Sequence, residues 1–147
     1  MKWTKFTVLA MFFTLIFISS LAMNLVIHEG AHYGVAEILG VNPEVRFTPE
    51  NVSSKNFFSM DTELAYVQYS SDTADITKDD ALIASAGPLA DLTLGSLGLF
   101  FYFKTKRTKV AKMLLVFVIV PALVSFVTNA MPVYPADGYY VFQYFFS

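Results

Sequence analysis

His28 and His32 are the two histidines of the chain, and Glu29 lies between them in the pattern His-Glu-Gly-Ala-His. On an α-helix, residues i and i+4 lie on the same face, so both imidazoles can reach one metal ion. Glu29 lies beside that face, where it can take a proton from zinc-bound water rather than bind the metal. The pattern predicts one zinc ion per chain, with His28 and His32 as ligands and Glu29 as general base. A histidine pair hydrogen-bonded to carbonyls at a helix end is the alternative.

A catalytic zinc usually has three protein ligands, so a third must come from elsewhere in the chain. The chain has no cysteine, and this leaves nitrogen and oxygen ligands. Glu37 is nine residues after His28, which turns it to the opposite helix face. Asp137 is the strongest candidate, because two prolines and a glycine interrupt the helical pattern of residues 129–138. Unwound backbone at membrane depth is tolerated only where it is buried or lines a wet cavity. An ordinary proline-rich turn is the alternative explanation.

Three apolar stretches must position these residues, and each is long enough to span a bilayer. A hydrocarbon core of about 30 Å needs about 20 helical residues. Residues 6–27 contain no charge, residues 81–103 contain one acid, and residues 110–128 contain one lysine near their start. The chain is 55% hydrophobic, above the roughly 45–50% of soluble domains. A signal peptide is the rival interpretation of the first stretch, but cleavage after Ala22 would leave only a stub before His28.

We therefore expect a single membrane-embedded domain over residues 1–147, mainly α, with a three-span helical core. The first span continues as a helix to about residue 39, where Gly40 and the proline that follows end it. Residues 41–70 carry short runs of β-branched and aromatic residues and predict a short β-hairpin segment. An unwound, proline-rich stretch and a short C-terminal helix over residues 138–147 complete the expected fold.

Charge is segregated along the chain. Residues 41–80 hold eight acids and three bases, whereas residues 104–112 hold five bases and no acid. The basic cluster joins two apolar stretches with no room for a recognition module, which argues against nucleic acid as a partner. Together with Lys2 and Lys5, it predicts a cytoplasmic loop, so the histidines face the opposite side. Residues 77–80, Thr-Lys-Asp-Asp, predict a capping box at the start of the second span.

Together these motifs resemble the site-2 protease family of intramembrane zinc proteases, as a minimal member without a PDZ domain. The HExxH signature of the family matches residues 28–32. Its second signature, NxxPxxxLDG, is matched by residues 129–138, with alanine in place of leucine, at Asn129, Pro132, Asp137 and Gly138. A third feature, Gly-Pro followed by Asn on a central membrane helix, is matched at Gly87 and Pro88, with Asp91 in place of Asn. The three matches occur in family order and involve all three spans.

The resemblance implies that His28, His32 and Asp137 bind zinc, that Glu29 is the general base, and that Asn129 holds the substrate carbonyl or the oxyanion. Supporting roles beside the ligands or in helix packing would fall to Gly87, Pro88, Asp91, Pro132 and Gly138. Asp91 could be protonated, bond an unwound carbonyl, or accept from a histidine N–H. The family carries its site near the cytosolic face, whereas the charge pattern here favours the opposite face.

The expected activity is hydrolysis of peptide bonds in or near transmembrane segments of other proteins. The β segment would present an edge to an unwound substrate helix. We expect a multi-pass protein of the cell membrane, with the lipid bilayer and a substrate helix as partners and with pairing into oligomers as an option. A catalytically inactive zinc-binding scaffold or chaperone of the same fold is one alternative. A small transporter subunit, with Asp91 and the histidines on an ion path, is another.

Overall fold

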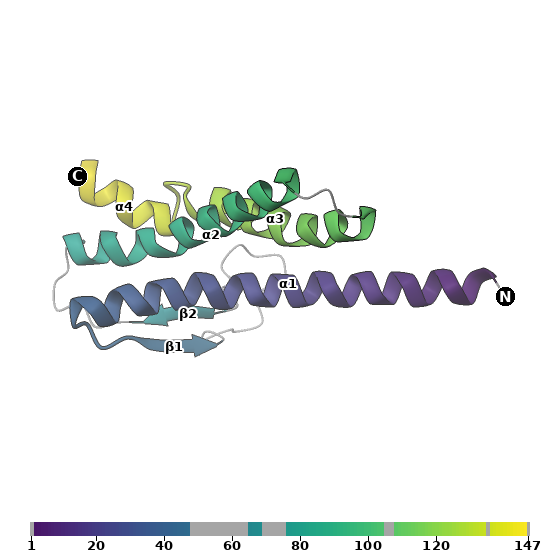
Figure 1. Cartoon of the computed structure of the whole chain (residues 1–147). Helices are drawn as coiled ribbons and strands as arrows, with labels where there is room; N and C mark the ends of the chain where they lie inside the picture. Colours follow the sequence, from purple (N-terminus) through teal and green to yellow (C-terminus); the bar gives the residue numbers. More distant parts are fainter. Residues whose placement is uncertain (1, 48–64, 69–75, 105–107, 135, 147) are drawn as a thin grey trace.

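The computed structural model describes residues 2–47, 65–68, 76–104, 108–134 and 136–146 (Figure 1). These residues form, in chain order, α1 (Lys2–Leu39), β1 (Glu44–Phe47), β2 (Ala65–Gln68), α2 (Lys78–Lys104), α3 (Lys109–Asn129) and α4 (Asp137–Phe146). The predicted mainly helical architecture is confirmed. Within the described residues, α1, α2 and α3 are each long and apolar enough to cross a membrane, which is consistent with a multi-pass membrane protein.

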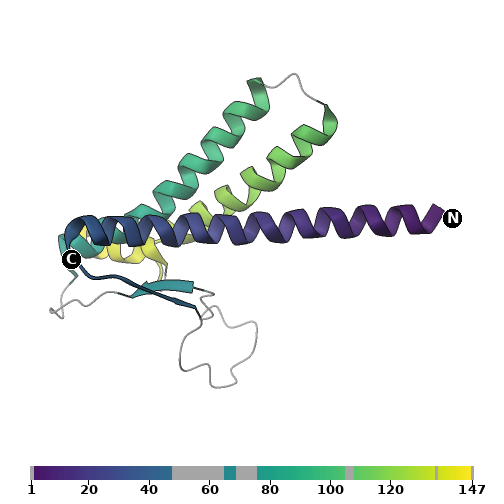
Figure 2. The same ribbon diagram turned by 60° about the horizontal axis from the view of Figure 1, so that its bottom comes forward.

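The longest element is α1, whose 38 residues extend about 57 Å. Its N-terminal part projects past the other helices (Figure 2). Large apolar side chains such as Phe6, Met11 and Leu15 are exposed there. Gly40 ends the helix with a φ of 77°, in the left-handed region. The Val41 N–H donates to the Ala36 carbonyl at 3.0 Å, which closes a glycine C-cap. The predicted helix stop is therefore confirmed.

A capping box begins α2, as the Thr-Lys-Asp-Asp pattern predicts. The N–H and the hydroxyl of Thr77 both donate to the Asp80 carboxylate at 2.7 Å, and the Asp80 N–H donates to the Thr77 hydroxyl at 3.2 Å. This reciprocal pair satisfies backbone groups that the first helical turn leaves unpaired. The helix accordingly begins at Lys78, three residues before the apolar stretch.

Small residues let α2 and α3 pack closely as neighbouring helices. A Cβ at Gly95 would lie 2.6 Å from the Leu123 side chain, and one at Gly98 would lie 2.6 Å from the Ile119 side chain. Replacing either glycine would therefore require the Leu123 or Ile119 side chain, or α3 itself, to move. Close approach at small residues is the usual basis of helix association in a membrane, where lipid removes the hydrophobic drive.

The strands β1 and β2 pair antiparallel, with a register that runs from Glu44 opposite Gln68 to Phe47 opposite Ala65. Both views show the pair on one side of α1 and the α2–α3 pair on the other. The turn of the predicted hairpin falls within residues 48–64 and so lies outside the described residues.

The chain between α3 and α4 is not helical where it is described. The Ala130 N–H still donates to the Phe126 carbonyl, and the Ala136 N–H closes a turn onto the Val133 carbonyl at 2.8 Å. Helix α4 then begins at Asp137, one residue before the expected start. Asp137 therefore lies in the first turn of a helix rather than in the unwound stretch before it.

Candidate metal centre

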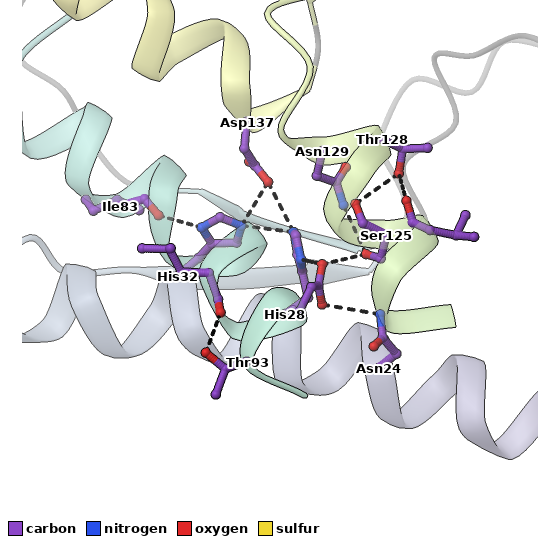
Figure 3. Close-up of polar contacts among 12 residues, drawn as sticks. Asn24, His28, His32, Ile83, Thr93, Ser125, Thr128, Asn129 and Asp137 are labelled. Carbon is purple, nitrogen blue, oxygen red and sulfur yellow. Dashed lines mark hydrogen bonds and ion pairs between the residues drawn. The ribbon is translucent and has the colours of Figure 1, made fainter. Parts of the chain in front are cut away.

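The structure brings Asp137 beside His28 and His32, which lie more than 100 residues earlier in the sequence (Figure 3). The two histidines come from α1, and Asp137 comes from α4, which packs against α2. The Nε2 atoms of His28 and His32 are 3.1 Å apart. Asp137 Oδ2 lies 3.1 Å from Nε2 of His28 and 3.4 Å from Nε2 of His32. Three potential ligand atoms thus form a nearly equilateral triangle.

The other nitrogen of each imidazole determines which atom faces this triangle. His32 Nδ1 lies 2.6 Å from the Ile83 carbonyl oxygen, which can only accept, so Nδ1 carries the proton. His28 Nδ1 lies 2.7 Å from Asp91 Oδ2, and a carboxylate there likewise accepts the Nδ1 proton. Nε2 of each ring therefore faces Asp137, and it offers a lone pair when the imidazole is in its neutral form. Two imidazole nitrogens and a carboxylate oxygen that converge in this way can share one cation between them.

Asp137 supplies the negative charge of the triangle. Its side chain is only 22% exposed. Burial raises the pKa of the Asp137 carboxyl, but its contacts with His28 and His32 outweigh burial and hold the pKa below its usual value. The group is therefore a carboxylate at neutral pH, which is the form that binds metal ions.

The spacing of the three atoms fits a small tetrahedral cation. Ligands at about 2.0–2.1 Å from a tetrahedral metal are about 3.3–3.4 Å apart. The observed separations of 3.1, 3.1 and 3.4 Å lie close to that value. His28, His32 and Asp137 could therefore hold a metal ion with little movement.

Gly87 of α2 passes directly against the imidazoles. A Cβ at this position would lie 2.6 Å from both Cε1 and Nε2 of His28, and closer still to Nε2 of His32. Any side chain at Gly87 would displace the candidate ligands. Pro88, the next residue, is buried in the same part of α2. Glycine is thus needed for the imidazoles to lie between α1 and α2.

Gly138 performs a similar role for Asp137. A Cβ there would lie 2.6 Å from the Met131 carbonyl oxygen and closer still to the Ala130 carbonyl. Because these atoms are backbone, they cannot turn aside as a side chain can. The lack of a side chain at Gly138 lets the start of α4 pack onto the backbone that follows α3, and this places Asp137 over the histidines.

A network of buried polar side chains lies behind His28. Asp91, which is 0% exposed, accepts from the Ser125 hydroxyl at 2.6 Å and from the Asn24 amide at 3.3 Å, besides its contact with His28. The Asn129 amide donates to Ser125 Oγ at 3.2 Å. Three helices thus meet around one carboxylate. The sequence left three alternatives for Asp91: protonation, a bond to an unwound carbonyl, or a contact with a histidine. The structure shows the contact with a histidine ring nitrogen, that of His28.

Sequence reasoning missed Asn24, Ser125 and the Ile83 carbonyl as partners. A signal for two of them was present. Asn24 is four residues before His28 in an apolar helix, and Ser125 is four residues before Asn129, so each pair shares a helix face. A backbone carbonyl carries no such signal, because every residue has one.

The remaining candidate residues do not belong to the ligand triangle. Glu29 lies on α1 next to His28 and is half-buried. The Asn129 side chain is directed to Ser125 at the end of α3. Pro132 is exposed in the turn before α4, so it packs against little of the described chain. Glu37 is exposed, accepts from the Tyr33 hydroxyl at 2.9 Å and is not part of the triangle.

Comparisons with models of known families, with curated proteins and with solved structures found no match. Functional inference therefore depends on the motifs and on the geometry of this site.

Proposed function

We propose that the protein is an intramembrane zinc metalloprotease that hydrolyses peptide bonds in or near transmembrane segments of other proteins. The observation that supports this most is the triangle of two Nε2 atoms and one carboxylate oxygen, with both Nδ1 atoms already engaged. Three protein ligands and an open fourth position are typical of catalytic zinc, whereas structural zinc usually has four protein ligands.

The donor set favours zinc over other abundant divalent cations. Two imidazoles and one carboxylate suit zinc, while magnesium and calcium prefer sites made of oxygen atoms only. Within the described residues, His28, His32 and Asp137 are the group of side chains able to share one ion. We propose one zinc ion per chain.

The proposed roles follow from the chemistry of each residue. When bound, zinc supplies Lewis-acid polarisation of the scissile carbonyl and lowers the pKa of water to about 7. Glu29, beside His28 on α1, accepts the proton of the attacking water and passes it to the leaving amine. Asn129 donates one amide N–H to Ser125, and the second holds the substrate carbonyl.

The substrate is a membrane helix that unwinds locally. A helix hides its carbonyls in hydrogen bonds, so glycine- or proline-containing helices are the favoured class. The antiparallel pair of β1 and β2, beside the site-bearing part of α1, is proposed to form a hairpin whose edge holds the unwound segment. We place the protein in the cell membrane, with three spans.

The test uses the full chain in lipid nanodiscs and a single-span model protein whose helix contains a Gly-Pro pair. We expect about one zinc per chain by elemental analysis of the purified protein. Cleavage is expected to stop with a zinc chelator and to return with added zinc. Glu29→Gln should keep the zinc and lose cleavage by at least about 100-fold, because it removes only the base.

Glu37→Gln is the matched control, because Glu37 is an exposed glutamate on the same helix, and it should cleave like the unmodified chain. Zinc content near zero would refute the metal centre. Undiminished cleavage by Glu29→Gln would refute the proposed mechanism. Zinc without cleavage of any helix in a panel of Gly- and Pro-containing sequences would favour the scaffold instead.

A further inference from the structure

The buried carboxylate of Asp91 lies outside the ligand triangle, yet it is the most completely buried acidic group of the described chain. An ionised side chain inside a membrane protein is costly unless it is paired or hydrogen-bonded. Asp91 has three polar neighbours around it, from His28, Ser125 and Asn24. These contacts satisfy the buried carboxylate and join it directly to one of the candidate ligands.

The donors also define which way the protons point. Ser125 Oγ accepts from the Asn129 amide, so its own proton is directed to Asp91. Asn24 presents its amide N–H to the other oxygen of Asp91. With Ser125 and Asn24 as donors, the carboxylate form of Asp91 can also accept from Nδ1 of His28, and this form satisfies all three neighbours. His28 is held as the tautomer with its proton on Nδ1, and its Nε2 lone pair faces Asp137.

Charge balance at the metal centre also favours the carboxylate form of Asp91. A divalent cation bound by two neutral imidazoles and Asp137 would keep one net positive charge in a poorly solvated place. Asp91 contacts His28, one of these ligands, so a second negative charge lies one imidazole away. Two carboxylates balance a divalent cation, and a neutral cluster is the least costly one to bury in a medium of low dielectric constant.

We propose that Asp91 is a positioning and charge-balancing residue of the metal centre: it fixes the orientation and tautomer of His28 and neutralises the bound ion. This inference rests on the metal centre of the proposed function, but it does not require proteolysis. The proposed role of Asp91 makes the two histidines different. His32 is oriented by the neutral carbonyl of Ile83, whereas His28 is oriented by a charged side chain.

Asp91→Asn separates charge from shape. The new amide oxygen can still accept from His28 and Ser125. Asn24 Oδ1 is buried and has no hydrogen-bond partner in the described part of the chain, so it can turn to accept from the new amide nitrogen. The variant is therefore expected to fold. Removal of such a carboxylate behind a ligand typically costs about 10–100-fold in metal affinity.

The experiment measures zinc affinity of the full chain in nanodiscs by competition with a chromophoric chelator. We expect Asp91→Asn to bind zinc about 10–100-fold more weakly than the unmodified chain. Thr93→Val is the control on the same helix, because its exposed hydroxyl donates to the Leu89 carbonyl of α2 and, in the described part of the chain, does not contact Asp91 or the triangle. It should bind zinc as tightly as the unmodified chain.

NMR spectroscopy distinguishes a specific effect on the orientation of His28 from a general loss of zinc affinity. With only two histidines, the ¹⁵N-histidine NMR spectrum of the zinc form should show two Nδ1–H protons. That of His28 should lie further downfield, because its acceptor is charged. In Asp91→Asn it should move upfield, while that of His32 stays.

Each outcome decides a different claim. Absence of zinc from the unmodified chain refutes the metal centre, and the role of Asp91 with it. Zinc bound equally well by Asp91→Asn, or an unmoved His28 proton, refutes the role of Asp91 and leaves the protease proposal standing. If Asp91→Asn does not fold, the unmodified spectrum decides: two Nδ1–H protons at one position would contradict a charged acceptor on His28.

Discussion

The two ends of α1 belong to one continuous helix but meet very different surroundings. Toward the N-terminus its apolar side chains are exposed, with Leu15 at 63%, and Figure 2 shows this part projecting away from α2 and α3. Toward the C-terminus four residues spaced by four are buried: Asn24, His28, His32 and Ala36. Three of these four are polar.

The difference shows which part of α1 depends on specific contacts with other helices. Lipid can cover the exposed end without any specific partner. The buried row of the other end follows the i, i+4 ridge along which helices pack, and its polar atoms have partners on α2 and α4. Substitutions at the two ends of α1 should therefore have different effects on stability and on zinc binding. The exposed end should tolerate change, whereas the buried row should respond to the loss or addition of single atoms.

The largest effect is expected from Gly87→Ala. Its methyl group would collide with the imidazoles of His28 and His32, so the triangle cannot form and zinc binding should be lost. Gly34→Ala is the matched control, since a Cβ there meets nothing within 4 Å, although Gly34 is only two residues from His32. It should retain zinc and add up to about 1 kcal/mol of helix stability. Zinc titration of both variants measures this, and equal binding would contradict the close packing at Gly87.

A smaller effect is expected from Gly138→Ala. The methyl group would push α4 away from the Ala130 and Met131 carbonyls, and Asp137 would move with the helix. The imidazoles should then bind zinc without their third ligand, with affinity lowered by about 10–100-fold or more. Gly30→Ala serves as the control, because a Cβ there also meets nothing within 4 Å. Unchanged zinc affinity in Gly138→Ala would show that Asp137 is not held by this contact.

The smallest effects compare apolar residues of equal size. Ile83 is 2% exposed, and Ile83→Ala should lower the free energy of unfolding by about 2 kcal/mol, since it leaves a cavity while keeping the carbonyl that accepts from His32. Leu15→Ala should change it by no more than about 0.5 kcal/mol, because lipid replaces the lost contacts. Unfolding by denaturing detergent in mixed micelles measures both. A larger loss for Leu15→Ala would show that a protein surface covers the exposed end.

Local features of this protein were predictable because short-range physics controls them. The helix stop at Gly40, the capping box of Thr77 and Asp80, and the shared face of His28 and His32 each depend on a few consecutive residues. The three long apolar helices follow from composition over about 20 residues. Asp137 was singled out because a break in the helical pattern surrounds it.

Non-local features needed the tertiary structure. That α4 begins at Asp137, and that a bare glycine of α2 touches both imidazoles, depends on how distant helices dock. His28 contacts Asp91, and His32 contacts the Ile83 carbonyl. Sequence spacing could not predict these two partners, because they depend on where α2 crosses α1.

By itself, the sequence determined the residue types and the helical phase that put two imidazoles on one face, because a helix repeats every 3.6 residues wherever it is. Only the tertiary structure decided that a carboxylate from the far end of the chain meets them at 3.1 and 3.4 Å. Those distances depend on close packing between helices, and packing is a property of the assembled chain rather than of any segment.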